Sequence, residues 1–111
     1  MFEKKEYNHE VFSNLEIVGM DHSGKLFTDC RFENCHFETV VFKNIIMEHC
    51  VFSSCAIILP DMTNAAFDDV TFDDCKIVGC NFSTINNFNL YPTIYGKQTL
   101  KMPRENRSVQ Q

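Results

Sequence analysis

Phenylalanine recurs at every fifth position along most of this chain. The stretch "CRFENCHFETVVFKNIIMEHCVFSSC" (30–55) carries Phe32, Phe37, Phe42, Met47 and Phe52 at this spacing. In steps of five from Phe2 to Phe82, every position except His22 is apolar or aromatic, and every phenylalanine except Phe88 lies on this frame. A period of five fits neither the 3.6-residue period of an α-helix nor the two-residue period of a β-strand. The backbone must therefore repeat as a unit of five residues.

A second apolar frame lies two residues before the first. All six cysteines of the chain lie on it, beside small or branched apolar residues: Cys30, Cys35, Cys50, Cys55, Cys75 and Cys80. The other three residues of each unit are mostly polar. Two side chains of each unit are therefore expected to point inward and three outward, as in stacked repeats that share one core.

Several units resemble those of the pentapeptide-repeat proteins, which read approximately A(D/N)Lxx. The matching units are "CRFEN" (30–34), "CHFET" (35–39), "CVFSS" (50–54), "AAFDD" (65–69), "VTFDD" (70–74) and "CNFST" (80–84). The resemblance covers about residues 1–85. It implies an all-β fold, a right-handed quadrilateral parallel β-helix in which four units make one square turn.

Four units per turn would align residues twenty positions apart in columns. The first predicted core column contains Phe12, Phe32, Phe52 and Phe72, and the column of Leu15, Cys35, Cys55 and Cys75 lies beside it. The columns predict a solenoid of about four coils, roughly 20 Å long at the spacing of β-strands. Because the cysteines are spaced Cx4C, neighbours would lie on different walls, which favours a role as small buried apolar residues over a zinc site.

The sequence divides into three predicted parts. Residues 1–85 form the β-helix, residues 86–102 form a C-terminal cap or a segment that pairs two chains into a homodimer, and residues 103–111 form a polar tail. The stretch from His22 to Lys25 interrupts both inward frames with polar side chains. Because burying them would be costly, we expect this part of the chain to bulge or loop outward.

Composition and charge limit the function. The chain is 44% hydrophobic, which suffices for a core, and carries a net charge of −5. Residues 1–85 hold 6 Lys and Arg against 14 Asp and Glu, while residues 86–111 hold 4 against 1. An acidic body argues against direct nucleic-acid binding. The first ten residues are charged, and no apolar run is long enough to span a membrane. We therefore expect a cytoplasmic protein that does not contact a membrane and that binds a protein partner.

Outward carboxylates form one candidate surface. It consists of Asp29, Glu48, Asp68, Asp69, Asp73 and Asp74. The family resemblance implies that rows of carboxylates can imitate DNA phosphates, the mechanism attributed to the members that occupy the DNA site of gyrase. The alternative is a solubilising surface that prevents aggregation of the coil edges.

Outward apolar residues form a second candidate surface. Leu26 and Ile46 share a column with Ala66, and a second column holds Val18, Ile58 and Val78, with Leu59 beside it. Contiguous exposed apolar surface is typical of an interaction site. Cover by the chain's own tail is the alternative.

No arrangement of residues indicates catalysis. The four histidines lack a paired carboxylate or nucleophile, and the glycines form no phosphate-binding loop, so we expect neither catalytic residues nor a metal or cofactor. The sequence therefore predicts a non-enzymatic interaction module. The sharper hypothesis is an acidic DNA mimic that inhibits a DNA-binding enzyme such as a topoisomerase, and the alternative is a scaffold or effector-like module that uses the apolar columns.

Overall fold

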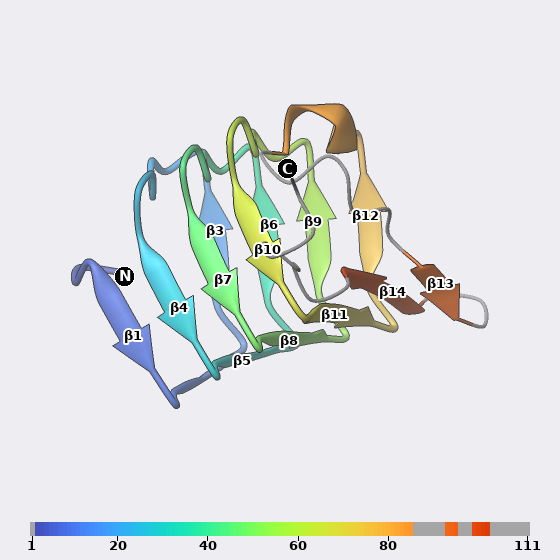
Figure 1. The fold of residues 1–111 in the computed structure, drawn as a ribbon, viewed down its shortest axis with the longest axis horizontal. Coiled ribbons are helices and arrows are strands. Elements are labelled where there is room, and N and C mark those ends of the chain that lie inside the picture. The colour runs from blue at the N-terminus through green and yellow to red at the C-terminus, as the bar shows by residue number, and fades with distance from the viewer. Residues whose placement is uncertain (1, 86–92, 96–98, 103–111) are drawn as a thin grey trace, which may run out of the picture.

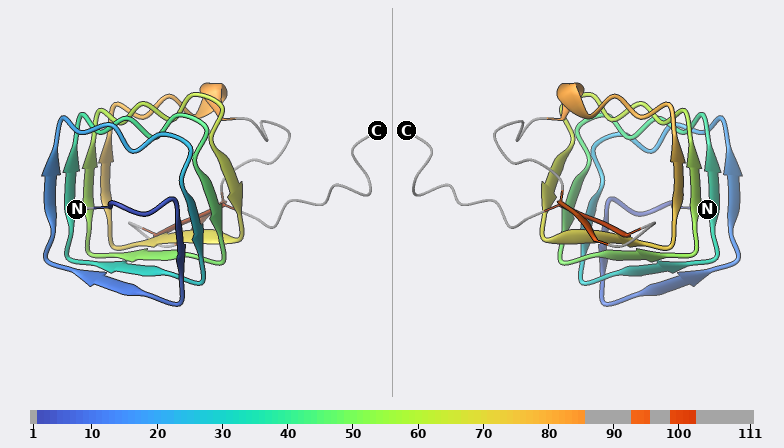
Figure 2. Two further views of the ribbon diagram at one scale, coloured as in Figure 1. Left: turned by 90° about the vertical axis from the view of Figure 1, so that its left-hand side faces the viewer. Right: turned by 90° about the vertical axis from the view of Figure 1, so that its right-hand side faces the viewer.

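The chain winds into a square parallel β-helix (Figures 1 and 2). The computed structural model describes residues 2–85, 93–95 and 99–102. Seen from its N-terminal end, the chain runs clockwise as it recedes, so the solenoid is right-handed (Figure 2, left). Phe32 pairs in register with Phe12 on one side and Phe52 on the other, so each coil takes twenty residues. The predicted all-β quadrilateral β-helix of about four coils is confirmed.

Three walls are sheets of short parallel strands. Sheet A contains β1 (Glu6–Asn8), β4 (Leu26–Thr28), β7 (Ile46–Glu48) and β10 (Ala66–Asp68). Sheet B contains β2 (Val11–Ser13), β5 (Arg31–Glu33), β8 (Val51–Ser53) and β11 (Val70–Asp73). Sheet C contains β3 (Glu16–Val18), β6 (His36–Glu38), β9 (Ala56–Ile58) and β12 (Lys76–Val78). Each three-residue strand points its middle side chain inward and the two flanking ones outward, which explains the alternation within each unit.

The fourth wall, here named the turn wall, consists of residues 20–24, 40–44, 60–64 and 80–84. Its coils are linked by isolated parallel bridges between Asp21 and Val41 and between Val41 and Asp61. Asp61 Oδ1 accepts hydrogen bonds from Thr63 N at 3.1 Å and Thr63 Oγ1 at 2.7 Å. Asp21 with Ser23 and Asn81 with Ser83 repeat this pattern. The short 3-10 helix η1 (Phe82–Thr84) belongs to the same wall (Figure 2).

The chain turns each corner through a residue with positive φ. These residues lie two positions after the inward residue of the first frame, and all have numbers ending in 4 or 9. Glycine adopts this conformation without strain, and asparagine and aspartate tolerate it better than other residues. Backbone geometry therefore explains why Asn, Asp and Gly are frequent at the third outward position of a unit. Leu59, with a φ of 50°, departs from this preference.

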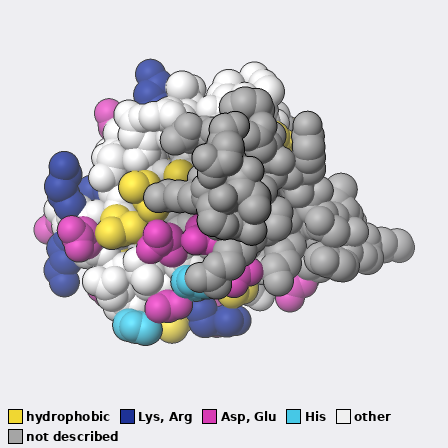
Figure 3. Space-filling view, in the orientation of Figure 1, with side chains coloured by type: hydrophobic (Ala, Val, Ile, Leu, Met, Phe, Trp, Pro, Cys, Tyr) yellow, Lys and Arg dark blue, Asp and Glu magenta, His cyan; other side chains and the backbone are white. Residues whose placement is uncertain are grey.

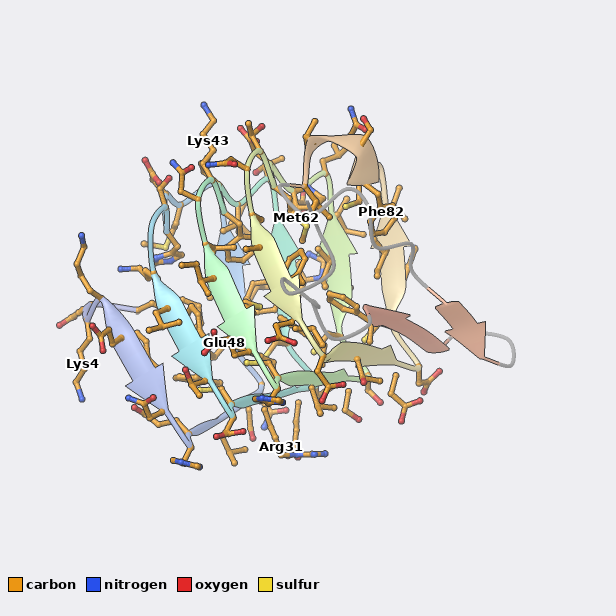
Figure 4. The ribbon with its side chains drawn as sticks, in the orientation of Figure 1. Lys4, Arg31, Lys43, Glu48, Met62 and Phe82 are labelled. Atoms are coloured by element: carbon orange, nitrogen blue, oxygen red, sulfur yellow. The ribbon has the colours of Figure 1, made fainter. Side chains whose placement is uncertain are left out.

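The aromatic column runs through the core. Ring centroids are 5.1 Å apart for Phe12 and Phe32, 4.5 Å for Phe32 and Phe52, and 4.8 Å for Phe52 and Phe72, all in stacked arrangement. Phe12 is half-buried, and the other three rings are buried. Figure 4 shows Met62 and Phe82 pointing into the same interior from the turn wall.

The cysteine column follows the aromatic column. The Sγ atoms of Cys35, Cys55 and Cys75 donate to the carbonyl oxygens of Phe12, Phe32 and Phe52, at 3.5, 3.2 and 3.3 Å. All six cysteines are free thiols. Burial raises the pKa of Cys50 to about 12 and that of Cys80 to about 11, so both remain protonated at neutral pH. Protonated thiols are poor nucleophiles, which agrees with a packing role for Cys50 and Cys80.

The expected bulge between His22 and Lys25 is absent, so that prediction was wrong. His22 lies inside the first coils, with 4% of its surface exposed, and neither ring nitrogen has a hydrogen-bond partner among the described residues. The backbone keeps the normal register, with bonds from His22 N to Val41 O and from Gly24 N to Lys43 O, each 2.8 Å. Lys25 remains half-exposed because its Nζ reaches out to Lys4 O at 3.1 Å.

Phe2 closes the N-terminal end of the core. Its ring is buried and makes edge contacts with Tyr7, Phe12 and His22, with centroids 5.8, 5.1 and 5.0 Å apart. It also contacts Phe27 and Phe32. Phe2, which precedes the first strand, therefore covers the aromatic interior that the first coil would otherwise leave exposed at this end.

At the other end, a hairpin extends sheet B. Strand β14 (Thr99–Met102) pairs antiparallel with β11, and β13 (Thr93–Tyr95) pairs antiparallel with β14. Within the predicted cap, these two strands therefore cover the edge of one wall. The rest of the predicted cap, residues 86–92 and 96–98, and the predicted tail, residues 103–111, lie outside the described residues.

Candidate protein-interaction surface

Two strand carboxylates lie where sheet A meets sheet B, here named the A/B corner. Glu48 ends β7 and Asp68 ends β10, and the two residues are direct partners in the parallel register. Thr28 occupies the same position one coil earlier. Figure 4 places Glu48 on the outer face of sheet A. Two neighbouring coils therefore present carboxylates side by side, one strand spacing apart.

The corner itself carries alternating histidine and aspartate. In successive coils the corner residue is His9, Asp29, His49 and Asp69. His9 Nε2 lies 3.6 Å from Asp29 Oδ2, and His49 Nδ1 lies 3.2 Å from Asp69 Oδ2. The two aspartates of the A/B corner, Asp29 and Asp69, each have a histidine neighbour.

The remaining predicted carboxylates lie at the other edge of sheet B. Asp73 ends β11, and Asp74 forms the corner toward sheet C. Glu33 shares the column of Asp73, two coils earlier, and its Oε2 lies 3.2 Å from Arg31 Nε. The six predicted acidic residues are therefore divided between two edges of sheet B and do not form one continuous cluster.

Backbone geometry separates these carboxylates into two kinds. Asp29, Asp69 and Asp74 occupy corners with φ between 54° and 56°, where aspartate is favoured for conformational reasons. Glu48 and Asp68 occupy extended strand positions that accept almost any outward side chain. Like charges directly opposite each other on neighbouring strands are destabilising. The pair formed by Glu48 and Asp68 therefore has no conformational reason of its own.

An apolar column lies on the same face as this carboxylate pair. Leu26, Ile46 and Ala66 are partners in register on β4, β7 and β10. The side chain of Ile46 is 41% exposed, whereas Leu26 and Ala66 are half-exposed. In Figure 3 apolar side chains on this face lie next to acidic ones. Sheet A therefore presents a short amphipathic surface two residues wide.

The second predicted apolar column is interrupted. On sheet C, Glu38 lies between Val18 and Ile58 in register, so only Ile58 and Val78 are neighbours. Leu59 follows Ile58 at the corner and is 56% exposed. Its side chain lies over Gly79, where a Cβ atom would clash with Leu59 Cδ2.

Two further exposed apolar residues lie outside both predicted columns. Val11 and Met20 are both exposed, the latter although it lies on the second inward frame. Met20 could not be recognised from its spacing, because its position differs from the buried Val40 only in lying at the N-terminal end of the solenoid.

The described side chains offer little for bond-making chemistry. In the ranges 2–85, 93–95 and 99–102, no group of three or more His, Cys, Asp or Glu residues could hold a metal ion. No helix in these same ranges has the length and apolar character needed to cross a membrane. What the chain does display are charged and apolar columns on rigid walls, an arrangement suited to binding a protein surface.

Comparison with known proteins agrees with this geometry. A family model described as the pentapeptide repeat region matches residues 25–90, more than half of the chain. A search of curated proteins found no match to this chain. The family match supports a repeat protein that acts as a non-enzymatic interaction module. The five-residue repeat, the twenty-residue coil and this family match together show that the chain belongs to the pentapeptide-repeat family.

Proposed function

We propose that this protein binds a basic protein surface through the carboxylates of the A/B corner, as a DNA mimic that inhibits a DNA-binding enzyme such as a topoisomerase. The observation that carries the proposal is the register pairing of Glu48 with Asp68. A like-charge pair on neighbouring strands is destabilising on its own and becomes favourable when a cation lies between the two carboxylates.

The structure offers a physical basis for such mimicry. DNA-binding sites hold phosphates with Lys and Arg side chains, which bind carboxylates through the same charge-assisted hydrogen bonds. Carboxylates one coil apart are spaced by about 4.8 Å and are fixed by a β-ladder rather than by a flexible loop. A partner therefore meets a preorganised row of negative charge and loses little conformational entropy of this chain on binding.

The test neutralises the carboxylates without changing their shape. Glu48→Gln combined with Asp68→Asn should abolish inhibition in a DNA-supercoiling assay, and adding Asp69→Asn, Asp73→Asn and Asp74→Asn should lower any residual binding. Glu16→Gln with Glu38→Gln removes two charges from sheet C and serves as the control that should retain inhibition.

Salt separates a charged interface from an apolar one. Binding through phosphate-like charges should weaken steeply between about 50 and 200 mM salt. Inhibition that survives neutralisation of the A/B corner, or binding that ignores salt, would reject the DNA-mimic proposal.

A second candidate is a scaffold or effector-like module that binds through Ile58, Leu59 and Val78. It is favoured by Leu59, which is exposed although its φ of 50° suits Asn or Gly better. Such strain in an exposed apolar residue is typical of a site kept for binding. Ile58→Asp and Leu59→Asn should each leave the fold intact and abolish capture of a protein partner, whereas Val18→Asp, beyond Glu38 on the same wall, should not.

The proposal also includes the cytoplasmic location and the homodimer suggested by the sequence. Strand β13 is the last strand of sheet B in the described part of the chain, so its outer edge is the place where a second copy could add a strand. Light scattering at several concentrations tests this pairing, since a monomer at every concentration would reject it.

A further inference from the structure

The N-terminal end of the core contains a buried histidine whose ring nitrogens are unpartnered. His22 is 4% exposed, and neither nitrogen has a hydrogen-bond partner among the described residues. Its ring packs against the Phe2 ring, with centroids 5.0 Å apart. A neutral imidazole can remain in such a place at a cost in stability, whereas an imidazolium needs a counter-ion or water. Protonation of His22 therefore requires the structure around it to open.

The charges nearest to His22 do not compensate an added proton. Lys25 and the amino terminus oppose protonation, and the Asp21 carboxylate favours it more weakly than Lys25 opposes it. Asp21 Oδ1 accepts hydrogen bonds from the backbone and the hydroxyl of Ser23, so it serves the turn rather than the imidazole.

The elements packed around this end add no compensating charge among the described residues. The N-terminal segment contributes Phe2, β1 contributes the buried Tyr7, whose hydroxyl accepts from Lys4 N at 2.7 Å, and the next coil places Phe42 in the column of His22. The charged side chains of the N-terminal segment and of this part of the next coil are exposed: Glu3, Lys4, Lys5 and Lys43.

The segment before the first strand is the part that can open most easily. The coil that carries His22 is bonded to the next coil through His22 N and Gly24 N, with hydrogen bonds of 2.8 Å each. Residues 2–4 precede β1, and the ring of Phe2 makes edge contacts with other rings. Lys4 is attached through hydrogen bonds with two side chains. Releasing this segment brings water to His22 without separating any pair of strands.

We propose that residues 2–4, here named the N-terminal lid, leave the end of the solenoid when His22 takes up a proton, while the coils stay folded. In the open form the rings of Phe12 and Phe27 lose the cover of Phe2. Strands β1, β2 and β3 are the end strands of their sheets in the described part of the chain. The lid thus converts a fall in pH into an aromatic surface beside three strand edges, which is the kind of surface that binds other proteins.

Proton linkage gives the direction and the pH range of this opening. Burial lowers the pKa of His22 in the closed form, and the charge of Lys25 lowers it further, whereas a hydrated imidazole has the ordinary value of 6.5. The open form therefore binds the proton first. Above this value His22 gives no pH dependence, and below it each further pH unit favours the open form about tenfold.

The test follows the lid and the coils separately by nuclear magnetic resonance on the full chain. Near neutral pH, nuclear Overhauser contacts should join the rings of Phe2 and Phe27. On titration toward about pH 5 they should be lost together with the change in the His22 imidazole signal, while the contacts between Phe52 and Phe72 remain. Simultaneous loss of both sets of contacts would mean global unfolding and overturn the proposal. So would a His22 that titrates with the Phe2 contacts in place, or one that stays neutral until the coils unfold.

Two variants and a control separate the lid from general effects of acid. His22→Phe introduces the residue found in this column at Phe42 and Phe82, and it should keep the Phe2 contacts throughout the titration. Phe2→Ala removes the cover and should shift the pKa of His22 upward toward 6.5. His36→Gln removes a histidine of sheet C and should leave the pH dependence of the lid unchanged. Release of Phe2 in His22→Phe, or an unchanged pKa of His22 in Phe2→Ala, would overturn the proposal.

Discussion

At the scale of single residues, His22 shows what a stacked core can accommodate. It occupies the column of Phe42, Met62 and Phe82, in contact with the Phe2 ring that closes the core. Desolvation by burial lowers the pKa of His22, with a further contribution from the nearby charge of Lys25. The imidazole is therefore buried in its neutral form with both nitrogens unsatisfied among the described residues. Such a group costs stability because water satisfied it in the unfolded chain.

Replacing His22 by phenylalanine should stabilise the protein and remove part of its acid sensitivity. The gain at pH 7 should be about 1–3 kcal/mol, the cost of an unsatisfied buried polar group. Because the folded pKa lies below the ordinary value of 6.5, the unfolded chain binds the proton first. Wild-type stability is therefore complete above about pH 6.5 and falls as the pH drops from there toward the folded pKa. Chemical denaturation at pH 7.0 and 5.5 should show this loss in the wild type and less of it in His22→Phe.

A surface histidine provides the comparison. His36 is half-buried, and its Nε2 lies 3.1 Å from Glu38 Oε1. His36→Gln should change the free energy of unfolding by less than about 1 kcal/mol, as for an exposed ion pair. If His22→Phe retained the full acid-dependent loss of the wild type, the buried neutral imidazole would not be its cause.

At the scale of elements, the turn wall differs from the three sheets in how it is held. Strands in sheets A, B and C bond to the next coil along their length, whereas the turn wall relies on isolated bridges and on side chains that cap its turns. Asp61 and Thr63 illustrate the cap, and the hydrogen bonds from Thr63 lower the pKa of Asp61. In the turn wall, hydrogen bonds to a short polar side chain take the place of continuous hydrogen bonding between strands.

Removing this cap should weaken the protein modestly. Asp61→Ala loses the acceptor for Thr63 N and Thr63 Oγ1 and should lower the free energy of unfolding by up to about 1 kcal/mol, since the site is largely exposed. Asp61→Asn keeps an acceptor oxygen and should retain most of the stability. The carboxylate contribution is present above about pH 3.8 and is lost as the pH falls through the lowered folded pKa. Thermal unfolding of the three proteins at pH 7 measures the difference, and equal losses for Ala and Asn would show that the cap does not matter.

The elements also show what the sequence could and could not predict. The period of five defined the inward frames and the twenty-residue columns, because the same side chains must pack in every coil. It could not distinguish the turn wall, because all four walls share this period. The pairs of Asp21 with Ser23 and Asp61 with Thr63 carried that signal. The expectation for His22 was wrong because strands β3 and β4, before and after it, are held in register, and the backbone hydrogen bonds of His22 and Gly24 to the next coil continue that register.

At the scale of the whole molecule, the solenoid separates the fold from its surface. Inward columns determine the coil, while outward strand positions such as Glu48 and Asp68 can change without affecting the ladder. For this reason the five-residue period predicted the core residues. For the surface it predicted only which residues face outward, and not which of them bind a partner. The register of the strands showed that Glu48 and Asp68 are neighbours, and the positive φ angles gave the corner aspartates a conformational explanation.

The same separation predicts that a whole coil can be removed. Deleting residues 50–69 joins His49 to Val70 and stacks Phe72 on Phe32, because Phe32, Phe52 and Phe72 share one register. The shortened protein should keep a β-rich circular dichroism spectrum and lose several kcal/mol of stability, since neighbouring-coil contacts add up along a repeat array. It also lacks Asp68, so binding through the A/B corner should be lost while the fold persists.

The matched comparison is a deletion of residues 50–67, which removes less of the chain but breaks the frame. Phe72 would then fall on an outward position, and the inward columns beyond His49 would be interrupted. This variant should unfold or aggregate, although it loses fewer residues. If both deletions folded equally well, or if the deletion of 50–69 gave a random-coil spectrum, the stacked columns would not be what holds this molecule together.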